Sequence, residues 1–131
     1  IKSIIDYPIF GIGLGNWKVF SIKTESQEYD EYQIPYHVHN DYLEVAAEIG
    51  IIGMILFYGI YIYLLIMYTK FFRKPKIPDS DKIFAITLVL GLIVYLIDSF
   101  LNFPFTRPVM QIPNLFLIGL SISCHLTLLH S

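Results

Sequence analysis

Charged side chains are scarce in this chain, and their scarcity excludes an ordinary water-soluble domain. Only 15% of the 131 residues are charged, whereas roughly a quarter is usual in soluble globular proteins, and 55% are hydrophobic. The mean hydropathy of +0.58 points the same way. No charged residue occurs from Met54 to Tyr68. The composition therefore predicts a membrane protein with several spans and not a single water-soluble core.

Cysteine is rare in the chain, and basic residues are not in excess. Cys124 is the single cysteine, so no internal disulfide can form, and its apolar neighbours in the sequence predict a buried thiol. The net charge of -2 gives no indication of a nucleic-acid partner. The sequence opens on Ile1 without a signal-peptide pattern, and we expect it to be a fragment of a longer protein.

Three apolar segments are long enough to cross a membrane as helices. We expect spans at about residues 50–69, 83–100 and 112–129, because about 20 apolar residues in a helix cover a bilayer core. Residues 1–49 are expected to form an extracytoplasmic loop region with short helices and the start of the first long helix. The predicted fold class is therefore all-α, a fragment of a polytopic membrane bundle with about three transmembrane helices and an outer-face loop region.

The distribution of Lys and Arg predicts how the spans are oriented. The connection between the first two spans carries five basic residues: Lys70, Arg73, Lys74, Lys76 and Lys82. The next connection carries only Arg107. Because short cytoplasmic loops are enriched in Lys and Arg, the first connection is expected to be cytoplasmic. Residues 1–49 and 101–113 would then share the outer side, the periplasm if the cell has one, together with His39 and Arg107.

A polar helix start at residues 39–49 runs directly into the first span. At 100° per residue, one face holds His39, Tyr42, Leu43, Ala46, Gly50 and Gly53, and the opposite face holds Asp41, Glu44 and Glu48. We expect the His39 face to contact protein, since its small residues let a neighbouring helix approach closely. The carboxylate face is expected to meet water or lipid headgroups. Asn40 or Asp41 is suited to cap this helix.

His39 has three interpretations from residue chemistry alone. An imidazole titrates near neutral pH, so it suits proton transfer, and a position at a helix N-terminus favours its neutral form and attracts anions. It can equally be a capping or interface histidine that only packs. A metal cluster with His37 and Asp41 is the third possibility, but the HxH spacing without further ligands is a weak signal and no metal is expected.

Glycines at alternate positions follow Pro8, which is expected to end any helix that leads into it. Gly11, Gly13 and Gly15 resemble half of a dinucleotide-binding fingerprint, but no strand–helix unit of the right length surrounds them. A glycine-rich turn at the membrane surface, with Trp17 at the headgroup level, is the preferred interpretation.

Several of these motifs together resemble the O-antigen ligase and O-antigen polymerase superfamily of membrane glycosyltransferases. His39-Asn40 is followed after nine residues by Gly50 and after two more by Gly53, like the signature of that family. The stretches PIFGIGLGNW at 8–17 and NFPFTRP at 102–108 are similar to segments on either side of the signature. The resemblance covers nearly the whole chain and implies that the chain is the C-terminal part of such a protein.

The resemblance implies a function, a location and a site. Such enzymes transfer a glycan from a polyprenyl-pyrophosphate carrier to a lipid, glycan or protein hydroxyl at the outer face of the bacterial inner membrane, and no cofactor is expected. His39 would be the catalytic residue, and Arg107 would bind the pyrophosphate unless it pairs with lipid phosphate or with Asp98. Asn40, Tyr42 and Asp98 are further candidates for substrate binding, although Asp98 can also be a plain interface carboxylate.

A membrane transporter or a non-catalytic scaffold in envelope assembly is the alternative. A transporter tends to keep polar groups and broken helices near the middle of the bilayer. Here the polar groups cluster toward the predicted outer surface, and this pattern favours chemistry on a lipid-borne substrate.

Overall fold

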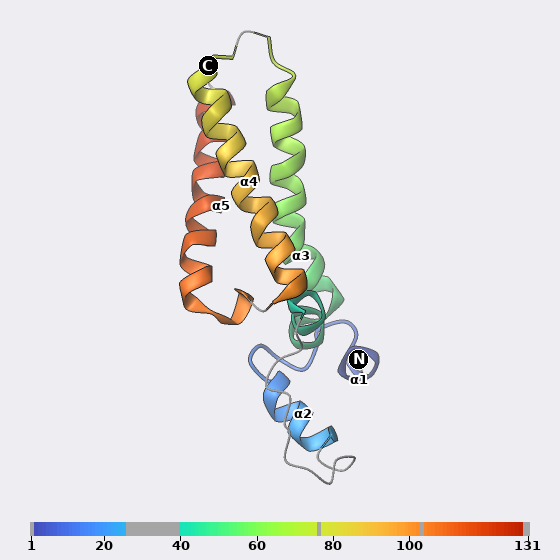
Figure 1. The fold of residues 1–131 in the computed structure, drawn as a ribbon. Helices are drawn as coiled ribbons and strands as arrows, with labels where there is room; N and C mark the ends of the chain where they lie inside the picture. The colour runs from blue at the N-terminus through green and yellow to red at the C-terminus, as the bar shows by residue number, and fades with distance from the viewer. Residues whose placement is uncertain (1, 26–39, 76, 103, 130–131) are drawn as a thin grey trace. The chain divides into compact units, whose positions relative to one another are not determined.

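The computed structural model describes residues 2–25, 40–75, 77–102 and 104–129. In chain order it has α1 (Lys2–Asp6), α2 (Trp17–Glu25), α3 (Asp41–Phe72), α4 (Asp79–Leu101), the short 3-10 helix η1 (Pro104–Thr106) and α5 (Pro108–Leu129), as Figure 1 shows. These described ranges contain no strand. The predicted all-α class is therefore confirmed.

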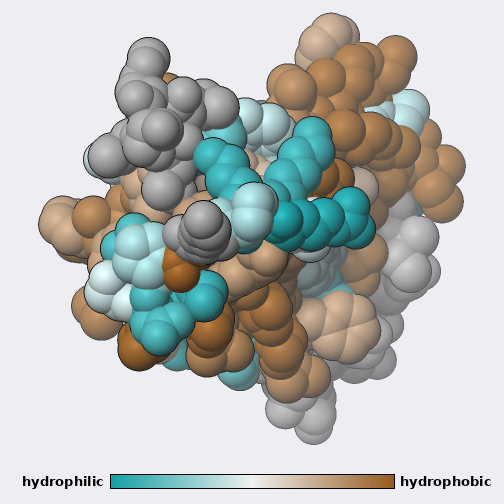
Figure 2. All heavy atoms as spheres, turned by 90° about the horizontal axis from the view of Figure 1, so that it is seen from above, coloured by the Kyte–Doolittle hydropathy of each residue, from teal (hydrophilic) through white to brown (hydrophobic). Residues whose placement is uncertain are grey.

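The helices α3, α4 and α5 are each long and apolar enough to cross a membrane. Hydrophobic residues cover much of the face in Figure 2, which views the molecule from above Figure 1, while hydrophilic residues gather in patches. The helix α3 begins at Asp41, within the polar helix start expected at residues 39–49, while α4 at Asp79 and α5 at Pro108 begin before the spans expected from the apolar pattern. The apolar run marks only the part of each helix that avoids water, whereas capping residues mark where the helix begins.

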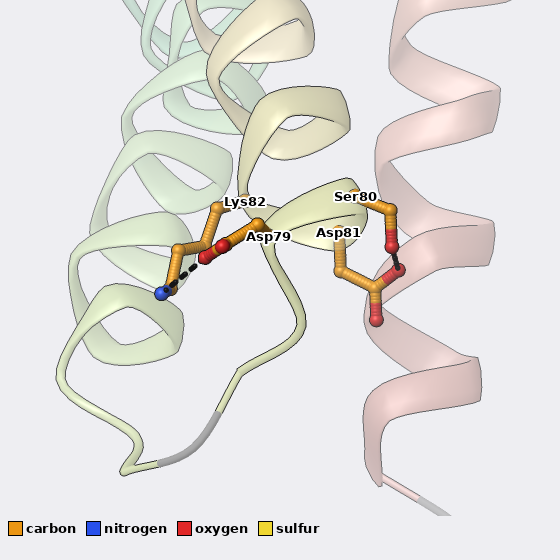
Figure 3. A network of polar contacts seen from close by, with 4 residues as sticks. All are labelled: Asp79, Ser80, Asp81 and Lys82. Atoms are coloured by element: carbon orange, nitrogen blue, oxygen red, sulfur yellow. Dashed lines mark hydrogen bonds and ion pairs between the residues drawn. The ribbon is translucent and has the colours of Figure 1, made fainter.

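The start of α4 illustrates such a polar first turn. Asp79 and Asp81 lie in this turn, where the partial positive charge of the helix N-terminus favours carboxylates. The Lys82 ammonium pairs with Asp79 at 3.0 Å, and the Ser80 hydroxyl donates to Asp81 at 3.2 Å (Figure 3). These exposed contacts each contribute about 1 kcal/mol at most.

The chain forms two compact units. The N-terminal unit comprises Ile1–Phe57 with Ser99–Phe103, and the helical unit comprises Tyr58–Asp98 with Pro104–Ser131. His37, His39 and Lys76 lie outside the described residues.

The helical unit packs three helices side by side. Buried residues recur at spacings of three and four along α3 and α4: Tyr61, Leu64, Tyr68 and Phe71, and Ala85, Leu88, Leu92 and Tyr95. The rings of Tyr61 and Tyr95 stack with centroids 5.5 Å apart. The buried Asn114 amide of α5 donates to the Tyr61 hydroxyl at 2.6 Å. This unit is therefore held together by apolar contacts and by hydrogen bonds between helices.

Candidate functional site

The N-terminal unit is built around a break in α3 at Gly50. The dihedral angles of Gly50 are φ 73° and ψ 178°, which are not helical and belong to a region that essentially only glycine occupies. After the break, residues 51–72 form a helix about 33 Å long at 1.5 Å per residue, which matches the thickness of a bilayer core. The break therefore separates a short first segment of α3, residues 41–49, from the membrane-length part.

Residues 8–16, here called the glycine strap, pair with α3 at this break. Three backbone hydrogen bonds join them, given from donor to acceptor: Ile51 to Pro8 at 2.9 Å, Ile12 to Ala47 at 3.0 Å and Gly13 to Glu48 at 2.8 Å. Buried backbone groups need partners, and breaking a helix removes some of them. The strap supplies these partners and thereby makes the break possible.

The close approach of the two backbones requires glycine on both sides. A Cβ atom on Gly11 would collide with the backbone of Glu48 and Gly50, and a Cβ atom on Gly50 would collide with the carbonyl of Ile9. Gly11 also has a positive φ of 68°. A close approach at Gly50 was predicted, but the partner is the strap and not a neighbouring helix. The alternate glycines Gly11, Gly13 and Gly15 therefore form a turn, as preferred above, and not part of a dinucleotide-binding fingerprint.

Glu48 connects the first segment of α3 to α2. The backbone N–H of Trp17, the first residue of α2, donates to the Glu48 carboxylate at 3.1 Å. Both side chains are buried, Glu48 at 4% exposure and Trp17 at 8%. The first N–H groups of a helix have no partner within it, and the helix N-terminus is partly positive. At the start of α2 the Glu48 carboxylate accepts a hydrogen bond from one of these N–H groups and places its negative charge next to the partly positive helix end.

The prediction that the carboxylate face of α3 meets water was wrong. Asp41, Glu44 and Glu48 are 0%, 3% and 4% exposed, whereas Leu43 on the opposite face is 41% exposed. The physical reason is visible at Glu48, where the start of α2 and the strap pack on this face. Trp17, expected at the headgroup level, is buried for the same reason.

The start of α3 uses Asn40 as its cap. The Asn40 side-chain oxygen accepts from the N–H of Leu43 at 3.3 Å, and its carbonyl accepts from Glu44 at 3.2 Å. The ring of the half-buried Tyr42 lies 6.4 Å from that of Phe100. Of the predicted substrate-binding residues, Asn40 and Tyr42 both lie in the N-terminal unit, one and three residues after His39 in the sequence.

Arg107 lies at the start of α5 in the helical unit. Its N–H donates to the carbonyl of Pro104 at 3.2 Å, and its own carbonyl accepts from Met110 at 2.9 Å and Gln111 at 3.0 Å. Proline follows as the first residue of the helix, where its missing N–H costs nothing. The backbone of Arg107 is thus fixed, while its side chain is exposed.

Gln111 holds the turn before α5 in place. Its side-chain amide donates to the Tyr95 hydroxyl at 3.1 Å and to the carbonyl of Phe105 at 2.9 Å. Since Tyr95 stacks on Tyr61, the turn that carries Arg107 is connected to both α4 and α3 within the helical unit. Asp98 is half-buried and lies in the same unit.

No group of three or more His, Cys, Asp or Glu side chains is placed to hold a metal ion within the described ranges. The proposed HxH ligands His37 and His39 are not among these residues.

The first part of the chain is similar to a known protein family. A family model described as O-antigen ligase matches residues 1–58. A protein of Rickettsia conorii whose name describes it as a candidate polysaccharide ligase is 33% identical over 100 residues, covering 72% of this chain and 24% of that protein. A protein of Rickettsia typhi with the same description is 33% identical over 104 residues, again covering 72% and 24%.

The chain spans about a quarter of the length of these curated relatives. No solved structure matches it. The family match includes the strap, the first segment of α3 and the break at Gly50. This match bears out the resemblance that the His39 motif predicted, and the similarity to the O-antigen ligase family model extends over residues 1–58.

Proposed function

We propose that this chain is part of a membrane glycosyltransferase that moves a glycan from a polyprenyl-pyrophosphate carrier to an acceptor hydroxyl. The observation that carries the proposal is the match of residues 1–58 to the O-antigen ligase family, because this stretch includes His39 and its motif. The names of the two Rickettsia relatives support glycan transfer, and the three apolar helices support a reaction at a membrane.

The reaction exchanges one bond at the anomeric carbon of the glycan for another. The acceptor oxygen bonds to this carbon while the bond to the pyrophosphate oxygen breaks, and the lipid pyrophosphate departs. We assign to His39 the removal of the acceptor proton, since a neutral imidazole is a good base near pH 7. Asn40, Tyr42 and Asp98 are assigned to substrate binding, because amide, phenol and carboxylate groups all form hydrogen bonds with sugar hydroxyls.

Loss of the full-length protein tests this function in the cell. Glycan should accumulate on the lipid carrier and disappear from its acceptor, and a plasmid copy of the gene should reverse both changes. An unchanged distribution of glycan between carrier and acceptor would contradict glycan transfer. Failure of the carrier-linked glycan to reach the outer face would instead indicate the transporter alternative.

The proposed location is the bacterial inner membrane with the N-terminal unit on the periplasmic side. Lys74→Cys and Leu14→Cys, each in a Cys124→Ser background, place single thiols at exposed positions of the two predicted sides. We expect a membrane-impermeant thiol reagent to label position 14, but not position 74, in intact spheroplasts, because the basic connection stays inside. Labelling of position 74 but not of position 14 would show that the orientation is opposite to the predicted one.

Arg107 is proposed to bind the pyrophosphate of the donor. Its guanidinium starts from a fixed backbone at the N-terminus of α5, and the helix end adds to the attraction of an anion. Arg107→Ala should lower donor use by about 10- to 100-fold, the size expected for losing a hydrogen bond to a charged group. Arg107→Lys should restore the activity only partly, because lysine keeps the charge but not the planar fork.

The other arginine of the chain provides the control for this pair of variants. Arg73 is exposed on the basic connection, and Arg73→Ala should leave both turnover and apparent donor affinity unchanged. Turnover and donor affinity should be measured separately for all three variants. If both Arg107 variants match the wild type, Arg107 is a membrane-interface residue and has no role in donor binding.

A further inference from the structure

We propose that the glycine strap anchors the N-terminal unit in the membrane surface, with the side chains of Ile9 and Phe10 among the lipid acyl chains. Both side chains are exposed, Ile9 at 55% and Phe10 at 79%. Large apolar side chains at this exposure are driven out of water, and exposed apolar patches often mark a membrane contact. Such an anchor does not depend on the proposed glycan transfer.

The pairing with α3 places these two residues at the start of its membrane-length part. The N–H of Ile51 donates to the carbonyl of Pro8 at 2.9 Å. The backbone of Ile9 and Phe10 lies against Gly50, where an added Cβ atom would collide with both. Since the membrane-length part of α3 begins directly after Gly50, Ile9 and Phe10 lie where this helix enters the bilayer.

Apolar side chains of α3 continue this surface. Ile51 and Ile52 directly follow the glycine that the strap contacts, and they are exposed, as are Ile55 and Leu56. All of them belong to the same compact unit as the strap. Neither stretch carries a charge, since no charged residue occurs at positions 7–17 or 49–69. The anchor patch therefore consists of six apolar residues: Ile9, Phe10, Ile51, Ile52, Ile55 and Leu56.

Lipid fits the anchor patch better than another transmembrane helix does. Helices pack closely in membranes through small residues, whereas the patch consists of isoleucine, leucine and phenylalanine. The two glycines next to it are already in contact with other groups: Gly50 lies against the strap, and Gly53 lies against the side chain of Ile49. Large apolar side chains of this kind are suited to the boundary between headgroups and acyl chains.

The rest of the strap leads away from this boundary. Its next hydrogen bonds, from Ile12 and Gly13, reach the first segment of α3, which precedes the break. Leu14 follows these residues, and its side chain is 67% exposed. A single exposed leucine is common on protein surfaces, so we expect Leu14 to face water. Leu14 therefore matches Phe10 in apolar character and in exposure but differs from it in position.

Spin labels on single cysteines test where each position lies. Phe10→Cys and Leu14→Cys variants of the full-length protein, each without other cysteines, would carry a nitroxide in vesicles of phosphatidylethanolamine and phosphatidylglycerol. At position 10, dissolved oxygen, which concentrates among acyl chains, should relax the label more than an aqueous nickel chelate does. At position 14 the order should be reversed. Lys23→Cys, at an exposed position of α2, is the control for a label in water.

Photolabelling of the wild-type protein gives a second readout that needs no substitution. The same vesicles would contain a lipid with a diazirine in the upper part of its acyl chain, and mass spectrometry would locate the adducts. We expect adducts on Ile9 or Phe10 and on α3 after Gly50, but not on residues 18–23 of α2. A variant that fails to fold therefore leaves the proposal open to test.

Each alternative surrounding of the anchor patch gives a different result and would overturn the lipid contact. A label at position 10 that nickel relaxes more than oxygen does would place Phe10 in water. Shielding from both reagents would mean that another part of the full-length protein covers the patch. Spectral broadening that disappears on dilution with unlabelled protein would indicate a second copy. Lipid adducts on α3 but none on the strap would contradict the anchor in the wild type.

Discussion

Replacing His39 by alanine is expected to reduce glycan transfer by roughly 100- to 10,000-fold, the usual contribution of a general acid or base. Membrane insertion and abundance should stay near normal. The reason is that Asn40, and not His39, caps α3 through its contact with Leu43, so the start of the helix survives the substitution. Transfer should be measured in membranes that contain the full-length protein, with abundance determined on the same samples.

His125→Ala is the matched control for this experiment. His125 lies in α5, away in sequence from every motif of the family resemblance, and we expect this variant to transfer glycan at the wild-type rate. A His39→Ala variant that keeps near wild-type turnover would leave His39 as a residue that only packs. The catalytic assignment would then have to move to another residue of the full-length protein.

Replacing Gly50 by alanine is expected to destabilise the protein by about 3 kcal/mol or more. Two effects combine: the φ of 73° at Gly50 is strained for any other residue, and the new Cβ would collide with the carbonyl of Ile9. Backbone atoms cannot move aside as a flexible side chain can. A loss of this size is a large part of the total stability of a typical domain, so abundance in the membrane should fall.

The other glycines of α3 provide graded controls. A Cβ atom added at Gly59, in the middle of a helix, would have no neighbouring atom within 4 Å. Gly59→Ala should therefore leave the stability unchanged or raise it slightly. At Gly53 the atoms nearest to the added Cβ belong to the side chain of Ile49 and not to a backbone, so Gly53→Ala should be intermediate. Thermal unfolding of the purified variants in detergent measures this order. Equal melting temperatures for the Gly50 and Gly59 variants would contradict the strap pairing.

The three long helices could be predicted because their signal is local. The apolar run from Met54 to Tyr68 must avoid water whatever surrounds it, and a helix is the structure that satisfies its own backbone in a membrane. The Lys and Pro residues after Phe72 mark the end of α3 equally clearly. The start of α3 was also predicted from its cap at Asn40, whereas α4 and α5 begin before the spans expected at residues 83 and 112.

The break at Gly50 could not be predicted because it depends on a pairing across the chain. Nothing in residues 41–53 alone distinguishes a glycine that lets a helix approach from one that breaks its own helix. The distinction comes from Pro8, Ile12 and Gly13, which supply the hydrogen bonds. The one sequence feature that indicates this pairing is the pattern of alternate glycines upstream. Gly11 and Gly50 both lack a Cβ atom, and this lets the two backbones lie in contact.

The orientation of the carboxylate face was missed for a related reason. Asp41, Glu44 and Glu48 form a polar stripe, and such a stripe usually faces solvent. At Glu48 a backbone N–H and a helix N-terminus replace the water, and neither can be recognised in a sequence. The candidate site was predictable only as residue types in a motif, as for His39 and Arg107. The role of Glu48 required the structure.

The most direct measurement of the central claim is a reconstituted transfer assay. The purified full-length protein would be placed in liposomes with a glycan linked to polyprenyl pyrophosphate and with an acceptor, in excess chelator. We predict that the glycan moves to the acceptor, that one polyprenyl pyrophosphate is released for each glycan transferred, and that the His39→Ala protein does neither. Transfer by the His39→Ala protein at the wild-type rate, or no transfer by a correctly folded wild type, would contradict the account.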